Sequence, residues 1–149
     1  MTSGYPEATT PLGREAETLY KQGFDAYQQQ QLVAARRLLE QSLFLFREAE
    51  HTPGILRSQH ILGNIAFSEG QYAIARTLHE DVLAACRAMN FQEGIASSLN
   101  NLGLIAGKQG MFAEGRALLE ESIRIYQQLG HSQEAAAARA NLESLHFIA

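Results

Sequence analysis

Cysteine, proline and tryptophan are almost missing from this 149-residue chain, which has one Cys, three Pro and no Trp. Cys86 has no second cysteine with which to form a disulfide, and a lone thiol is typical of a reducing compartment. Residues 1–7 lack the basic and apolar regions of a signal peptide, and no apolar run approaches the ~20 residues of a membrane span. We therefore expect a cytoplasmic protein that does not associate with membranes.

Charge is also scarce. Charged residues make up 19% of the chain and the formal net charge is −4. Because a repeat protein that binds DNA or RNA needs a basic face to neutralise phosphates, we do not expect a nucleic-acid partner. The apolar share of 46% and the length fit one globular domain, which buries roughly 70% of its unfolded surface at this size.

Patterns typical of catalytic and metal sites are not found. The five histidines never occur at i, i+4 spacing or beside the cysteine, so they do not indicate a metal site. Cys86 follows two alanines in an apolar helical stretch, where a small buried thiol is expected rather than a nucleophile. Since no nucleophile and base are paired either, we expect no enzyme activity, no metal and no cofactor.

A regular repeat runs through most of the chain. Gly23, Gly63 and Gly103 are evenly spaced, since 63−23 = 40 and 103−63 = 40. A fixed period of about 20–50 residues is typical of solenoids, which offer binding surfaces. Other residues recur in the same register: Ala26, Ala66 and Ala106; Arg36, Arg76 and Arg116; Leu38, Leu78 and Leu118; Glu40, Glu80 and Glu120.

Each repeat divides into two helical stretches, because apolar residues fall at i, i+3 and i+4 with a turn signal between them. In the second repeat we expect helices over residues 55–69 and 73–89, closed by a turn at Gly70, with breaks at Pro53-Gly54 and Gly94. Glycine inside a helix costs ~1 kcal/mol, so Gly63 and its equivalents indicate close packing of the two helices. The arginine and glutamate of each repeat are expected to form i, i+4 surface pairs.

These signals predict an all-α fold, a solenoid of antiparallel helix pairs with about seven helices, the last from Ser132. Residues 1–13 are rich in Pro, Gly, Ser and Thr and are expected to be a flexible lead-in. The solenoid then covers residues 14–149, as repeats of about 14–54, 55–94 and 95–134 and a partial repeat at 135–149.

The stretch from Leu62 to Arg76 and its counterpart from Leu102 to Arg116 resemble tetratricopeptide repeats. The resemblance is to the forty-residue variant found in bacterial regulators, signalling ATPases and kinesin light chains, and it covers residues 14–149. It implies a right-handed solenoid that holds a protein or peptide in a concave groove lined by the first helix of each repeat. A subset of the family clamps a C-terminal carboxylate with lysine, asparagine and arginine side chains. That clamp is absent here, because the corresponding places hold Tyr20, Phe24, Ile61, Ser97 and Asn101.

Helical spacing places a polar stripe on the groove side of each first helix. We expect the partner to contact twelve residues of it: Tyr20, Lys21, Phe24, Arg57, His60, Ile61, Asn64, Asn100, Asn101, Leu104, Lys108 and Asn141.

The cations on the stripe, Lys21, Arg57 and Lys108, outnumber Glu17 by 3−1 = 2, which favours an acidic partner segment. The alternative is that these cations are simply solvated. The asparagine amides are suited to hydrogen bonding with an extended peptide backbone, or alternatively to tying adjacent helices together.

Four apolar residues near the C-terminus, Leu142, Leu145, Phe147 and Ile148, have no following helix to cover them. Solenoids usually finish with a polar cap, so this end favours a homodimer or a longer repeat array. The sequence as a whole predicts a non-catalytic protein-interaction module, an adaptor or scaffold. The alternative is a sensory module that controls a transcription regulator or a signalling ATPase, which rests only on the family resemblance.

Overall fold

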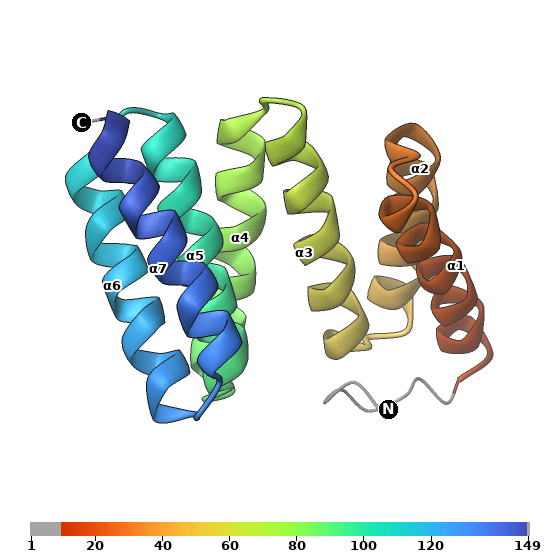
Figure 1. Ribbon diagram of the computed structural model, residues 1–149. Coiled ribbons are helices and arrows are strands. Elements are labelled where there is room, and N and C mark those ends of the chain that lie inside the picture. Colours follow the sequence, from red (N-terminus) through yellow and green to blue (C-terminus); the bar gives the residue numbers. More distant parts are fainter. Residues whose placement is uncertain (1–9, 149) are drawn as a thin grey trace. The chain divides into compact units, whose positions relative to one another are not determined.

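The structure, a computed structural model, describes residues 10–148, and this range folds into α-helices without a strand (Figure 1). Side chains are described as far as Leu145. The helices within this range are α1 (Pro11–Gln28), α2 (Leu32–Glu48), α3 (Thr52–Ser68), α4 (Tyr72–Ala88), α5 (Gln92–Lys108), α6 (Phe112–Gln128) and α7 (Ser132–Ile148). The expected all-α class and its seven helices are confirmed.

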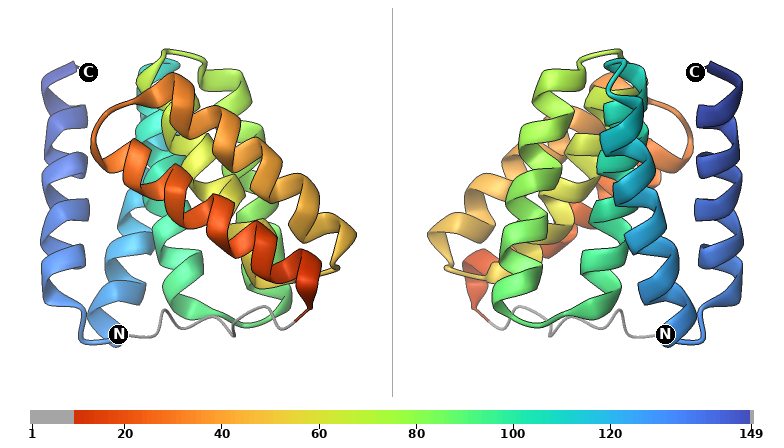
Figure 2. Two further views of the ribbon diagram at one scale, coloured as in Figure 1. Left: turned by 90° about the vertical axis from the view of Figure 1, so that its right-hand side faces the viewer. Right: turned by 90° about the vertical axis from the view of Figure 1, so that its left-hand side faces the viewer.

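The chain divides into two compact parts between Glu69 and Gly70, which separates the two helices of the second repeat. In the N-terminal part, α1 packs on α2 and α2 on α3, and α1 also touches α3. In the C-terminal part, α4 packs on α5, α5 on α6 and α6 on α7, and α5 also touches α7. Figures 1 and 2 show α7 running alongside α6. Each part therefore brings first helices of successive repeats into contact, α1 with α3 and α5 with α7.

The turns between helices follow a period half as long as the sequence repeat. A residue with positive φ follows each helix from α1 to α6, and these residues are evenly spaced along the chain: Gln30, Glu50, Gly70, Asn90, Gly110 and Gly130. After Gln30, Glu50, Asn90, Gly110 and Gly130 the next amide bonds back to the helix, as in the 2.9 Å bond from the His51 N–H to the Phe46 carbonyl. Such left-handed caps favour glycine, and any other residue there lowers the free energy of unfolding by roughly 1–2 kcal/mol. The sequence predicted such turns within the repeats, as at Gly70, but none of the three between repeats, at Glu50, Asn90 and Gly130.

Helix α1 begins at Pro11, ahead of the expected start at Arg14. Thr10 caps it, since its Oγ1 accepts a hydrogen bond from the Gly13 N–H at 3.0 Å. Proline fits the first turn because the N–H it lacks would have no partner in the helix. Residues 11–13 are therefore helical rather than part of a lead-in, and residues 1–9 of the expected lead-in lie outside the described range.

The expected breaks at Pro53-Gly54 and Gly94 are wrong. These residues lie in the first turns of α3 and α5, which begin at Thr52 and Gln92. A β-carbon on Gly94 would lie 2.5 Å from the Cys86 Sγ, and one on Gly54 would overlap the Phe46 ring. The glycines are needed because α3 and α5 start close against the preceding helix, not because the chain stops being helical.

Close helix packing accounts for the glycines inside the first helices. A β-carbon on Gly23 would lie 2.8 Å from Leu39 Cγ, and one on Gly103 would lie 2.6 Å from Leu119 Cγ. Both leucines are fully buried. The close approach expected from the repeated glycines is thus confirmed at Gly23 and Gly103.

Two buried serines add hydrogen bonds to this packing. Ser42 on α2 donates to the Ala16 carbonyl of α1 at 2.9 Å, and Ser122 on α6 donates to the Ala96 carbonyl of α5 at 2.7 Å. The two serines hold equivalent positions in the first and third repeats. The same contact between the first and second helix is therefore built in both parts.

Candidate interaction surface

The predicted groove residues form two patches, one in each compact part. The N-terminal patch consists of Glu17, Tyr20, Lys21 and Phe24 on α1 with Arg57, His60 and Asn64 on α3. The C-terminal patch consists of Asn100, Asn101, Leu104 and Lys108 on α5 with Asn141 on α7. Within these patches Lys21 and Lys108 are exposed and the other members are partly buried.

An ion pair between Glu17 and Arg57 joins the two helices of the N-terminal patch. Their side chains are only 14% and 13% exposed, respectively. The Arg57 guanidinium carbon also lies 4.6 Å from the centre of the Tyr20 ring, within the range of a cation–π contact. Arg57 and Glu17 therefore neutralise one another, and the net positive charge of this patch comes from Lys21.

The aromatic members of the patch stack on one another. The ring centres of Tyr20 and Phe24 lie 6.2 Å apart with an angle of 17° between the ring planes. Burial raises the pKa of the Tyr20 phenol, the positive charge of Arg57 lowers it and the carboxylate of Glu17 raises it. The net direction is upward, so Tyr20 presents a neutral ring and hydroxyl at neutral pH.

His60 is the titratable neighbour of this cluster on α3. Burial lowers the pKa of its imidazole below the ordinary value of 6.5. The side chain is therefore neutral at pH 7 and adds no charge to the patch.

Ile61 does not belong to the accessible surface, which corrects the sequence-based expectation. It is 6% exposed and lies in the core. The expectation assumed one packed face on each first helix, but α3 has nine buried residues where α1 has four. The polar stripe on α3 is consequently narrower than helical spacing alone indicated.

Two asparagines of the C-terminal patch bond to one another. The Asn141 side-chain amide donates to Asn100 Oδ1 at 3.0 Å, which ties α7 to α5. Of the two roles considered for the asparagines, linking adjacent helices is the one seen for this pair. Asn101 makes no side-chain hydrogen bond among the residues the structure describes.

On the second helices, the repeated arginine also contacts residues of the next repeat, beyond the expected i, i+4 pair. Arg76 bonds to Glu80 at 2.9 Å as expected, but it also bonds to Gln109 at 2.9 Å and pairs with Glu114. Arg36 pairs with Glu69 at the end of α3. These contacts link one repeat to the next within each part. The signal in the sequence was an acid or amide at the same distance after Arg36 and Arg76, since 69−36 = 33 and 109−76 = 33.

The expected self-association surface at the C-terminus is partly corrected. Leu145 is 4% exposed and packs against Gly107 of α5, so it is not available to a second copy. Leu142 is half-buried. The side chains of Phe147 and Ile148 lie outside the described residues.

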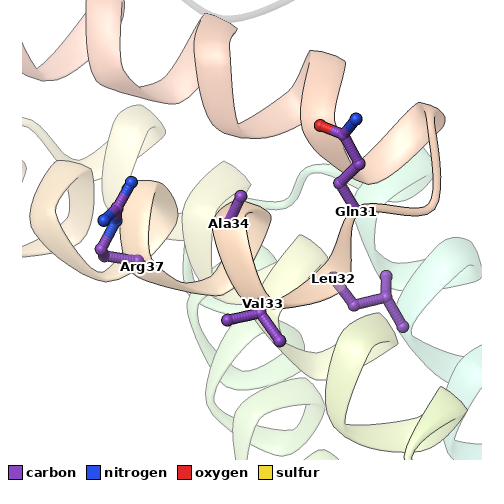
Figure 3. Close-up of a pocket in the computed structure, with 5 residues that line it drawn as sticks. All are labelled: Gln31, Leu32, Val33, Ala34 and Arg37. Atoms are coloured by element: carbon purple, nitrogen blue, oxygen red, sulfur yellow. The ribbon is translucent and has the colours of Figure 1, made fainter.

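A separate open depression of about 430 Å³ lies beside the first turn of α2 (Figure 3). It is lined by Gln31, Leu32, Val33, Ala34 and Arg37, none of which was predicted to bind a partner. Val33 is 84% exposed there.

Within residues 10–148, no group of three or more His, Cys, Asp or Glu side chains could hold a metal ion. In the same range, no helix has the length and apolar character needed to cross a membrane.

The chain is similar to known repeat proteins. Models of the tetratricopeptide repeat match residues 14–88 and residues 95–129. Among solved structures, the crystal structure of the apo form of RapI resembles the chain with a TM-score of 0.84 and 20% sequence identity. The alignment covers 93% of this chain and 50% of that protein, so the chain spans about half its length. No curated protein matches the chain. The likeness supports an all-α solenoid of antiparallel helix pairs.

Proposed function

Because the chain belongs to the tetratricopeptide repeat family, whose members bind proteins or peptides, we propose that it is a non-catalytic adaptor that binds an extended, acidic peptide segment on its first helices. The supporting observation is the pattern of exposure in the two patches. Lys21 and Lys108, the only lysines of the chain, are both exposed there. Lysine is a flexible cation that meets carboxylates in varied geometries. In a chain with a net charge of −4, these two cations favour an acidic partner.

Seven of the remaining patch residues divide into two roles. Arg57, Asn100 and Asn141 are engaged with neighbouring helices and hold the first helices in place. Tyr20, Phe24 and Leu104 offer partly buried apolar surface, and Asn101 offers an amide that both donates and accepts hydrogen bonds. In each part, an exposed lysine beside partly buried apolar surface suits a segment whose acidic side chains alternate with apolar ones and whose backbone is extended. The lone cysteine, which is buried, favours the cytoplasm as the place of action.

The test is affinity capture from the native host with three forms of the protein. The first is the wild type, and the second carries Lys21→Glu and Lys108→Glu. The third is a matched control with Arg37→Glu and Arg124→Glu, which has the same net charge but changes exposed arginines on α2 and α6. A partner held by the wild type and the control but lost by the lysine variant supports the proposal.

Equal capture by the wild type and the lysine variant would place the interface elsewhere, and loss only in the control would place it on the second helices. If no protein is captured by any form, the adaptor function is contradicted, and the alternative of a sensory module gains support.

A further inference from the structure

The N-terminal patch holds an acid and a base side by side, and the C-terminal patch does not. Glu17 and Arg57 occupy equivalent positions in successive repeats, since 57−17 = 40. The next two equivalents, Ser97 and Ala137, carry no charge. The pair is therefore not part of the repeat pattern.

Two aromatic rings lie close to the guanidinium of the pair. Tyr20 lies against the guanidinium of Arg57 and stacks with Phe24, and the Phe46 ring centre is 5.7 Å from the same guanidinium. The exposed Lys21 follows Tyr20 on α1. The Glu17 carboxylate bound to Arg57 thus lies beside aromatic rings, and Lys21, four residues further along α1, is a second cation on the same helix face.

A partner carboxylate can replace Glu17 without leaving a charge unpaired. Removing one member of a partly buried ion pair is costly because the other charge stays without a counter-ion. Exchange of one carboxylate for another avoids that cost, and the released Glu17 side chain can be solvated. Guanidinium binds carboxylates through paired, directional hydrogen bonds, so the incoming group has to match the geometry that Glu17 now has.

We propose that Glu17 is a specificity-determining residue that occupies the place of an acidic side chain of the partner, which displaces it from Arg57 on binding. This inference rests on the adaptor function proposed above and assigns a role to one residue of that surface. Glu17 therefore restricts which segments bind, because only a segment that presents a carboxylate next to an apolar side chain competes with it for Arg57. An acidic residue without such a neighbour is held by Lys21 alone.

The experiment uses the full chain and a library of random short peptides. Peptides selected by the wild type are labelled with a fluorophore, and their affinities are measured by fluorescence anisotropy for the wild type and for Glu17→Gln. If Arg57 is free of Glu17 about a tenth of the time, removing the competitor tightens binding about tenfold. Glu15→Gln is the matched control, because it removes the same charge from an exposed position of α1 and leaves Arg57 paired. It should leave the affinity nearly unchanged.

A second form of the peptide separates exchange from a general charge effect. When the Asp and Glu residues of a selected peptide are replaced by Asn and Gln, its affinity should be the same for the wild type and Glu17→Gln. The double variant Glu17→Gln/Arg57→Gln should not show the increased affinity for the acidic peptide that Glu17→Gln shows. Circular dichroism checks that its helical content is unchanged.

Acidic peptides that bind Glu17→Gln no more tightly than the wild type overturn the inference and leave the adaptor function standing. Selected peptides without acidic residues overturn it as well. Failure to select any peptide contradicts the adaptor function itself and the inference with it.

Discussion

Leu145 of α7 packs against Gly107 of α5, in the space that a β-carbon at residue 107 would occupy. The leucine is 4% exposed, and its second methyl lies 3.2 Å from the position a β-carbon would take on Gly115 of α6. The Leu145 side chain of α7 therefore packs against both α5 and α6. This contact explains why an apolar residue near the C-terminus is buried by the chain itself.

The first prediction concerns this contact. Leu145→Ala should lower the free energy of unfolding by about 2–5 kcal/mol, because it removes a buried leucine and leaves a cavity. Gly107→Ala should lower it by about 1–3 kcal/mol through overpacking. Both are measured by urea denaturation. Leu142→Ala, at a half-buried position of the same helix, is the control, and a loss there as large as at Leu145 would contradict this assignment.

The second prediction concerns the left-handed turn residues. Glu50 has a φ of 53°, so Glu50→Gly should stabilise the protein by about 1 kcal/mol and raise its melting temperature by about 2–4 °C. Glu40→Gly changes an exposed residue inside α2 and should have the opposite effect, a loss of about 1 kcal/mol. Thermal denaturation followed by circular dichroism compares the two variants. A lower melting temperature for Glu50→Gly would show that the positive φ of Glu50 does not destabilise the protein.

The third prediction is a dependence of stability on pH. Burial lowers the pKa of His60 in the folded state, while the unfolded chain keeps a value near 6.5. Stability from this group is therefore fully present above pH 6.5 and decreases as the pH falls toward the folded-state pKa, because the unfolded state binds the proton first. His60→Asn, which introduces the residue found at position 100, should flatten the curve between pH 7 and 5. An unchanged slope in urea denaturation would contradict this.

The fourth prediction separates two arginines that the repeat makes equivalent. Arg76 contacts Glu80, Gln109 and Glu114, so Arg76→Ala should cost about 1–2 kcal/mol. Arg116 has no ion pair among the residues described, so Arg116→Ala should change stability by less than about 0.5 kcal/mol. Equal losses in chemical denaturation would mean that the arginine acts within its own helix and not between repeats.

The sequence predicted the helices and the repeat well because both depend on local periodicity. Apolar spacing and the regular register identify Gly23, Gly103 and the turns at Gly70 and Gly110 directly. The turns between repeats, at Glu50, Asn90 and Gly130, were not predicted, and glutamate in particular does not signal a left-handed conformation. Helix starts at Thr52 and Gln92 were placed too late because Gly54 and Gly94, which permit close packing, look like breaks.

The side-chain contacts of the candidate surface were harder to predict because they join helices of different repeats. Glu17 and Arg57 were recognised on the same stripe, but their charges were counted separately. Only the contact of α1 with α3 makes them a pair. Ile61 was misplaced for a related reason, since its burial depends on how many neighbours pack around α3.

The most direct test of the account is a ¹H–¹⁵N NMR titration of the protein with the partner segment identified by capture. We predict that chemical-shift changes cluster on the first helices, at Tyr20, Lys21, Asn101 and Lys108, and that Lys21→Glu/Lys108→Glu abolishes them. Changes confined to the exposed surface of α2 around Val33 and Phe44 would contradict the claim that the first helices bind the partner.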